Sequence, residues 1–249
     1  MACVGAAAAA KTTGGKAMAE CMHEANVKVI WLQESATQCL SDIWDNQYPE
    51  EDWEALCFQV TLLLTQLEKE ANAVFQAGTI VRQDDDAQVV ILADRGVWDG
   101  QVYCSELVWR ATWDIVYGEL GCSRPDEVLR GHETPHADTS TAEGLYSEVC
   151  RRHLYDVALH AISLATDKPE VYNRVKSSNA ARQCDLKTAR TTCPMFGQLY
   201  AQHAKYMVPI DNDGCEEHHH KGMKMLVQRY MYIVANEGLQ NKLKSVPVC

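Results

Sequence analysis

Hydrophobic and polar positions alternate in blocks along the chain, and these blocks predict short strands separated by helices. Uninterrupted or alternating apolar runs predict strands at residues 1–4, 27–32, 89–93, 155–163 and 206–210. The third run is apolar throughout, which is typical of a strand buried on both faces of a parallel sheet. Pro209 lacks an N–H group, so the last run is expected to be an edge strand or to end there.

Longer stretches repeat apolar residues at helical spacing. They predict helices at about 11–25, 50–77, 98–120, 180–192 and 218–237. Gly78 is expected to end the second helix, and Pro194 and Gly197 to interrupt or restart the fourth, while 168–179 is polar and irregular. Several apolar side chains are expected to face the core, namely Trp53, Leu56, Val60, Leu63, Leu64, Leu67, Trp109 and Trp113. The alternation favours an α/β fold, a parallel sheet with helices on both faces.

Length and composition restrict the class of protein. A chain of 249 residues with 47% hydrophobic and 23% charged residues suits one domain, expected over 1–240 with a loose tail at 241–249. The net charge of −11 argues against binding nucleic acid or anionic membranes. Eleven cysteines without a secretory signal suggest a reducing compartment, and we expect no transmembrane segment. The cytoplasm is the expected location, with an organelle as the alternative.

Asp94 and Arg95 follow the strand predicted at 89–93. Ligands of open α/β sheets bind at the carboxyl ends of the strands. There the carboxylate can hold a hydrated Mg²⁺ ion and the guanidinium can bind a phosphate. The alternative is that Asp94 caps the next helix and pairs with Arg95.

A second candidate site lies at the start of the first predicted helix. Gly5, Ala10, Lys11 and Thr12 fit the phosphate-binding pattern G-x-x-x-x-G-K-[ST], except that Ala10 replaces the second glycine. An alanine in a left-handed position costs roughly 1–2 kcal/mol, which weakens binding about tenfold or somewhat more. The alternative is a run of alanines that begins a helix.

Other clusters offer weaker signals. The run at 215–220 combines a cysteine, two glutamates and three histidines, but no C-x-x-C pair or second histidine pair complements it, so a solvated helix start is favoured over a metal site. His132 and His136 are expected at the surface. No Cys-His signature marks the cysteines as catalytic, and esterase and zinc-protease motifs are absent.

Pieces spread over residues 4–237 together resemble a known family in their order and spacing. They are Gly5 with Lys11-Thr12-Thr13, Val27-Lys28-Val29-Ile30 with Glu34-Ser35-Ala36-Thr37, Phe58-Gln59 with Gln66 and Glu68, Asp94-Arg95-Gly96 with Asp99-Gly100, Tyr155-Asp156, Asn179-Ala180-Ala181-Arg182 with Arg190, and Ile210-Asp211-Asn212. The chain thereby resembles the AAA-type ATPase/kinase-like P-loop family that includes the nicotinamide-riboside-kinase domain of NadR, and more distantly nucleotide kinases. The resemblance implies a P-loop NTPase fold with a five-stranded parallel sheet in the order 2-3-1-4-5.

The resemblance also implies roles for individual residues. Gly5, Ala10, Lys11, Thr12 and Thr13 would form the phosphate loop, with Lys11 on the β- and γ-phosphates. Thr12 and Asp94 would hold Mg²⁺.

Further roles follow for the rest of the matched residues. Glu34 would act as base or substrate contact, and Arg95 would steady substrate or phosphate. Arg182 and Arg190 would lie in a lid and stabilise the transferring phosphoryl group. Asp211 and Asn212 would lie near the base of the nucleotide.

Two functions therefore remain open. In the first, the chain binds MgATP or MgGTP and, if it is an enzyme, acts as an ATPase or a small-molecule kinase that transfers the γ-phosphoryl group to water or to a small hydroxylated acceptor. In the second, it is a catalytically silent relative that serves as an interaction or assembly subunit with a protein partner, which the row of alanines favours. A small GTPase-like switch is disfavoured, since no Asn-Lys-x-Asp signature occurs.

Overall fold

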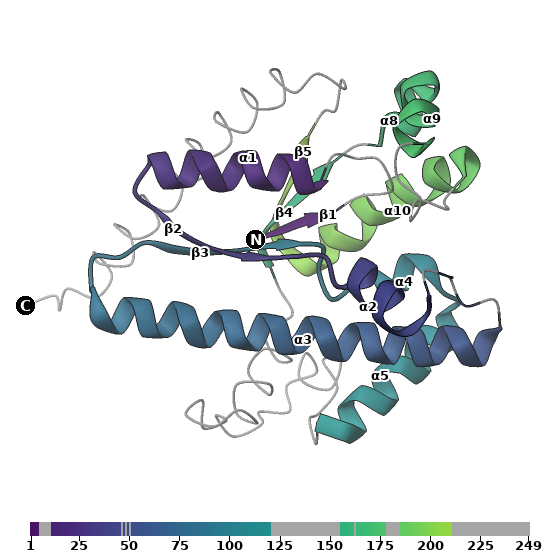
Figure 1. Cartoon of the computed structure of the whole chain (residues 1–249), viewed down its shortest axis with the longest axis horizontal. Coiled ribbons are helices and arrows are strands. Elements are labelled where there is room, and N and C mark those ends of the chain that lie inside the picture. The colour runs from purple at the N-terminus through teal and green to yellow at the C-terminus, as the bar shows by residue number, and fades with distance from the viewer. Residues whose placement is uncertain are drawn as a thin grey trace, which may run out of the picture.

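The computed structural model describes residues 1–4, 11–45, 47, 49, 51–120, 155–161, 163–177 and 185–210. Helices and a parallel sheet together make up this part of the chain (Figure 1). The predicted helix at 218–237 and the tail at 241–249 lie outside it. Within the described ranges, no helix combines the length and the apolar character needed to cross a membrane.

The five strands form one sheet in the order β2-β3-β1-β4-β5. All neighbouring pairs are parallel, with Leu32 opposite Ala93 and Cys3 opposite Asp94. The strands span Ala2–Val4 (β1), Lys28–Leu32 (β2), Val89–Asp94 (β3), Tyr155–Ala161 (β4) and Ala204–Ile210 (β5). β3 lies inside the sheet and its second half is buried, as its apolar sequence predicts. β5 is an edge strand among the described strands, as Pro209 predicts.

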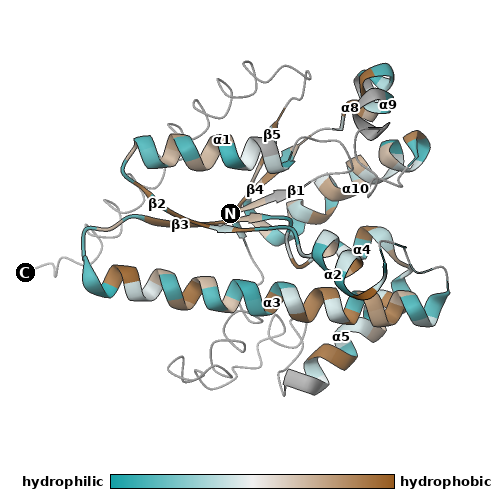
Figure 2. Cartoon of the chain, in the orientation of Figure 1, coloured by the Kyte–Doolittle hydropathy of each residue, from teal (hydrophilic) through white to brown (hydrophobic). Residues whose placement is uncertain are grey.

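Helices cover both faces of the sheet. α1 (Lys11–Glu24) packs Met18 and Met22 against Leu92 and Leu159 on one face. Three helices share the other face, namely α3 (Asp52–Gln83), α5 (Glu106–Leu120) and α10 (Leu186–His203). Figure 1 shows α1 and α3 on opposite sides of the strands, and Figure 2 shows hydrophobic residues along β2 and β3.

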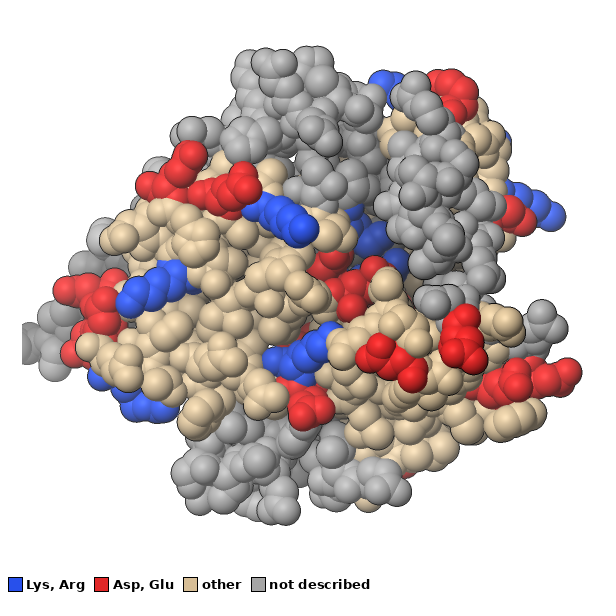
Figure 3. Space-filling model, viewed as in Figure 1, with Lys and Arg blue, Asp and Glu red and all other residues tan. Residues whose placement is uncertain are grey.

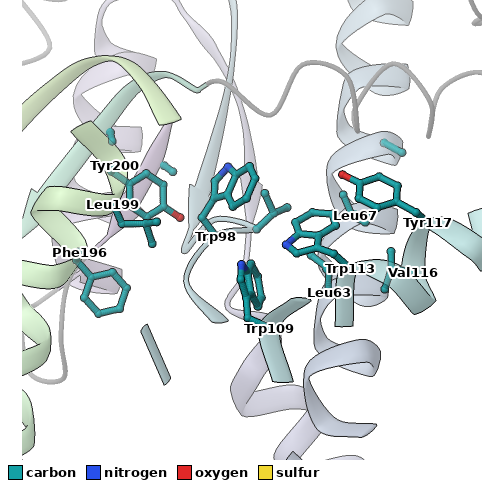
Figure 4. Close-up of a cluster of buried hydrophobic side chains, with 14 of the residues drawn as sticks. Leu63, Leu67, Trp98, Trp109, Trp113, Val116, Tyr117, Phe196, Leu199 and Tyr200 are labelled. Atoms are coloured by element: carbon teal, nitrogen blue, oxygen red, sulfur yellow. The ribbon is translucent and has the colours of Figure 1, made fainter. Parts of the chain in front are cut away.

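Aromatic side chains fill the second layer. Trp98 contacts Trp113 with a centroid distance of 5.4 Å, and Trp113 stacks on Tyr117 at 5.0 Å. Figure 4 shows Trp98 between the α10 side chains and those of α3 and α5. Trp109 and Trp113 are buried, as predicted. The prediction for Trp53 was wrong, because Trp53 is 65% exposed in the first turn of α3, ahead of the buried stretch that begins at Phe58.

Two helix boundaries differ from the predictions. α3 continues through Gly78 to Gln83, since Gly78 has ordinary helical backbone and helices tolerate a glycine at a modest cost. The helix predicted at 98–120 is divided into α4 (Gly100–Tyr103) and α5. Cys104 is extended, and the Ser105 hydroxyl accepts a hydrogen bond from the Val108 N–H at 3.3 Å, so Ser105 caps the start of α5.

Three further helices complete the described fold. α2 (Ser35–Ile43) was not predicted. α8 (Leu164–Asp167), which is capped by Ser163, was not predicted either. The segment 168–179, predicted to be irregular, instead contains α9 (Pro169–Ser177), whose first residue is a proline, a favourable first helical position.

α10 also departs from its prediction. It begins after the Asp185 cap and runs through Pro194 and Gly197. Gly197 lets the helix approach the His160 ring closely, because a Cβ atom there would lie 3.1 Å from it.

Candidate functional site

Five residues singled out in the sequence meet at the carboxyl edge of the sheet. Lys11 and Thr12 begin α1, and Glu34 precedes α2. Asp94 is the last residue of β3, and Arg95 follows it. Figure 3 shows acidic and basic side chains side by side near the centre of this face, where Figure 1 places the beginnings of α1 and α2. Parallel strands bring these positions together because their carboxyl ends share one edge.

Only one oxygen of the Asp94 carboxylate forms a hydrogen bond with the described residues. Its Oδ2 accepts a hydrogen bond from the Thr12 hydroxyl. Its Oδ1 is buried and has no hydrogen-bond partner among the described residues. Burial raises the pKa of Asp94, against the Thr12 hydrogen bond and the charges of Lys11 and Arg95. A buried carboxylate oxygen without a donor gains most from a cation, so Asp94 and the Thr12 hydroxyl fit Mg²⁺, which prefers oxygen ligands.

Lys11 lies beside these oxygen atoms. Burial and the nearby Arg95 charge lower its pKa to about 8, while Glu34, Asp94 and Asp99 act in the opposite direction. The ammonium group therefore stays largely charged at neutral pH. It can neutralise an anion that binds at the start of α1, where helix N–H groups also favour negative charge.

Arg95 links two carboxylates. Its Nε donates to Glu34 Oε1, and its Nη1 donates to Asp99 Oδ2 at 3.0 Å and to the Tyr103 hydroxyl at 3.3 Å. Burial alone would raise the pKa of Glu34, but Arg95 and Lys11 outweigh it and hold that pKa at about 2. Asp94 binds Thr12 and Arg95 binds Glu34 and Asp99, so the alternative of a mutual Asp94–Arg95 pair is not the observed arrangement.

A second set of polar groups supports this pair. The Tyr200 hydroxyl donates to Asp99 Oδ1 at 2.6 Å, and burial raises the pKa of Asp99 despite Arg95 and Tyr200. The Tyr155 hydroxyl donates to Glu70 Oε1 at 2.7 Å and accepts from the Val97 N–H at 2.9 Å. These groups fix the turn that carries Arg95.

The sequence analysis did not predict these supporting residues as site residues. Asp99 and Tyr155 belong to the pieces that carry the family resemblance, so a signal for them exists. Tyr200 and Glu70 sit within helical patterns that indicate only packing.

The remaining predicted site residues are placed differently or lie outside the description. Arg190 is exposed on α10 and donates from Nε to the Ala165 carbonyl at 2.7 Å, so its observed contact is with α8. Thr13 lies in the first turn of α1. Five predicted residues and three metal-ligand candidates lie outside the described residues, namely Gly5, Ala10, Arg182, Asp211, Asn212, His132, His136 and the run at 215–220.

Cys104 and Cys193, two of the described cysteines, have environments that bear on their reactivity. Burial raises the pKa of the Cys104 thiol to about 11, which disfavours the reactive thiolate. Cys193 is buried, and its Sγ accepts from the Ser163 N–H at 3.3 Å. Among the described residues, no group of three or more metal-binding side chains occurs.

A pocket adjoins the Arg95 side of the cluster. It has a volume of about 30 Å³ and lies between α2, α3 and the segment from Arg95 to Trp109. Its surface is mostly apolar, and its lining includes the polar residues Ser35, Gln59, Gln66, Arg95 and Asp99. The pocket therefore shares Arg95 and Asp99 with the charged cluster.

Comparison with known proteins adds no assignment. No model of a known protein family matches the chain, and no curated protein matches it.

Proposed function

We propose that the chain is a P-loop NTPase-like protein that binds MgATP or MgGTP at the carboxyl edge of its sheet. The observation that carries this proposal is the Thr12–Asp94 pair, in which a helix-start hydroxyl and a strand-end carboxylate meet and one buried carboxylate oxygen lacks a partner. The proposed function supplies that partner, because Mg²⁺ bound with the nucleotide would be held by these two side chains.

Lys11 and the strand order support the same proposal. Lys11 begins the helix that follows β1, which is the position of the phosphate-binding lysine in the G-x-x-x-x-G-K-[ST] pattern. The strand order β2-β3-β1-β4-β5 is the one that the family resemblance implies. Mg²⁺ would neutralise charge on the phosphate oxygens, and Lys11 would bind and orient the phosphates.

In this proposal Glu34 orients the acceptor and does not act as a general base. A carboxylate with a pKa of about 2 removes a proton weakly at neutral pH. Phosphoryl transfer passes through a loose transition state that depends more on positioning than on proton removal. Glu34 would therefore orient the hydroxyl of a small acceptor, or a water molecule, while Arg95 holds the carboxylate in place.

A second candidate function is a silent interaction subunit. Large apolar side chains are exposed at the ends of α2 and α4 and at the starts of α3 and α5, namely Ile43, Tyr103, Trp53 and Leu107. Such side chains can contribute to a protein interface. In this case the chain would bind a partner protein without turning over nucleotide.

Calorimetric titration with MgATP and MgGTP tests the first proposal. Lys11→Ala should weaken binding at least about tenfold, because the charge on the phosphates is lost. Lys16→Ala is the matched control, since Lys16 is an exposed lysine on the same helix. Absence of binding in the folded wild-type chain, or equal binding by Lys11→Ala, would overturn the proposal and favour the interaction subunit.

A further inference from the structure

Gln66 forms hydrogen bonds on both sides of the charged cluster. Its side chain is buried on α3. Its Oε1 accepts from the Ser35 hydroxyl at 2.8 Å, and its Nε2 donates to the Arg95 carbonyl at 3.4 Å. Ser35 directly follows Glu34 in the chain. One amide therefore contacts the residue next to Glu34 and the backbone of Arg95, whose side chains form an ion pair.

The partners of Gln66 fix the orientation of its amide. Its Nε2 also donates to Glu70 Oε1 at 2.9 Å. An amide has two N–H donors and one carbonyl oxygen. The Arg95 carbonyl and the Glu70 carboxylate both accept, so the two donors face them and the oxygen faces the Ser35 hydroxyl. A rotated amide would set its oxygen against two acceptors, so this orientation is well defined.

The backbone of Arg95 needs such support. Its φ angle of 85° is unfavourable for a residue with a Cβ atom, and such conformations persist where several contacts hold them. The Gln66 bond to its carbonyl is one contact. At the other end of the turn, the Val97 N–H donates to the Tyr155 hydroxyl, which in turn donates to Glu70 Oε1. Because Gln66 donates to the same Glu70 oxygen, one network holds both ends of the turn.

We propose that Gln66 is a positioning residue of the candidate site, which fixes the Glu34 carboxylate relative to the Arg95 guanidinium. The inference rests on the proposed function, in which this pair orients the acceptor. Gln66 acts through Ser35 and the Arg95 carbonyl. A looser pair would orient a bound hydroxyl less well, and positioning supplies a large part of the rate of phosphoryl transfer.

Gln59 provides a matched comparison. It lies two helical turns before Gln66 on α3, is also buried and lines the same pocket. Among the described residues, the Ser35 hydroxyl and the Arg95 carbonyl bond to Gln66 and not to Gln59. Replacement of either glutamine by leucine removes one buried amide from the same helix. Only the loss of Gln66 should loosen the Glu34–Arg95 pair.

The exchange of the Arg95 Nε hydrogen with water tests the inference. Arg95 Nε donates this hydrogen to Glu34 Oε1, so it exchanges slowly while the pair is fixed. NMR of the ¹⁵N-labelled full chain without nucleotide measures the rate, and loss of the signal in Arg95→Lys identifies it. In Gln66→Leu the rate should rise about tenfold, because the bonds to Ser35 and to the Arg95 carbonyl are lost. In Gln59→Leu it should stay unchanged.

Ser35→Ala provides a second test if a thermal melt shows that Gln66→Leu does not fold. It removes only the bond between the Ser35 hydroxyl and Gln66 Oε1. The exchange rate should then rise about threefold. Unchanged exchange in the folded Ser35→Ala chain would in that case overturn the inference.

The outcomes separate this inference from the proposed function. Faster exchange in Gln66→Leu with unchanged exchange in Gln59→Leu supports the positioning role, whether or not the chain binds MgATP. Equal rates in Gln66→Leu and wild type, equal acceleration in both leucine variants, or wild-type exchange as fast as that of free arginine would overturn it. MgATP binding together with any of these three results would leave the proposed function standing and remove only the role of Gln66.

Discussion

The buried charge of the Asp94 carboxylate destabilises the fold but suits the binding of a cation. Its pKa is raised above the ordinary value of 3.8, first by burial. An acid whose pKa is higher in the folded chain than in the unfolded chain destabilises the fold at pH values above both. The ionised carboxylate at neutral pH is therefore a cost to folding that a bound cation would offset.

Asp94→Asn separates the two effects. The amide oxygen can still accept the Thr12 hydrogen bond, and the buried charge is removed, so the free energy of unfolding at pH 7 should rise by about 1 kcal/mol. MgATP should no longer stabilise the variant. Urea unfolding with and without MgATP measures both quantities. Asp85→Asn, at an exposed aspartate, should change neither.

Two results would contradict this prediction. A free Asp94→Asn chain that is less stable than the wild type would show that the carboxylate contributes to the fold. Full stabilisation of the variant by MgATP would show that Asp94 does not hold the ion.

At the residue scale, part of the site was predictable. Glu34 and Asp94 each follow or end a predicted strand, so the rule for parallel sheets places them at one edge. Tyr200 was not predictable, because its hydroxyl reaches Asp99 over 101 positions of the sequence. That contact depends on how α10 packs against the sheet, which periodicity does not specify.

At the element scale, the effect of replacing a glycine by alanine depends on the atoms that surround it. Gly78 lies inside α3, where an added Cβ atom would meet only Arg82 Nη1 at 3.5 Å. Gly78→Ala should therefore raise the free energy of unfolding by about 0.5–1 kcal/mol, because glycine loses more backbone entropy in a helix than alanine does. Gly96→Ala should lower it, because the added methyl group would overlap the Tyr200 hydroxyl and lie 2.7 Å from that of Tyr155.

Chemical unfolding of the two variants checks both signs in one experiment. A stabilising effect of Gly96→Ala would mean that the two tyrosines can move without loss of their hydrogen bonds to Asp99 and Glu70. A destabilising effect of Gly78→Ala would mean that α3 bends at Gly78.

At the element scale, strands were predicted better than helix boundaries. Short apolar runs bounded by polar residues gave strands within a few residues of the observed bounds. Helix ends failed where local signals conflict with packing. Pro194 is exposed within α10, and the helix continues past it to place Phe196 and Tyr200 in the core. Tertiary contacts there outweigh the local preference of proline.

At the scale of the whole molecule, the charged cluster makes the free energy of unfolding depend on pH. The pKa of Glu34 is lowered from 4.5 to about 2. A lowered pKa stabilises the folded chain above the unfolded value, and this contribution is lost as the pH falls from about 4.5 to 2. It amounts to at most about 3 kcal/mol, since the Glu34 side chain is 27% exposed.

Glu34→Gln should make unfolding less sensitive to acid in that window, as measured by urea unfolding between pH 5 and pH 2. Burial raises the pKa values of Glu70, Asp94 and Asp99, which act in the opposite sense and are present in both chains. Glu68→Gln, at an exposed glutamate, is the control. Parallel stability curves for Glu34→Gln and wild type would show that the Arg95 pair adds nothing to stability.

For the molecule as a whole, the sequence predicted the α/β fold class. Alternating blocks indicate helices over a parallel sheet, and the structure has both. The break between α4 and α5 and the helical character of 169–177 did not follow, because capping by Ser105 and a favourable first-turn proline are weak signals in polar sequence.

Arg95 has a consequence for directed evolution of this chain. Its φ angle of 85° lies in the left-handed region, where a long side chain carries a strain of about 1–3 kcal/mol and glycine carries little. A library sorted only for expression and heat resistance would favour Arg95→Gly to whatever extent the released strain exceeds the lost ion pairs. Such a library would discard the guanidinium that joins Glu34 to Asp99, so improved variants of this chain must be sorted for ligand binding as well as for folding.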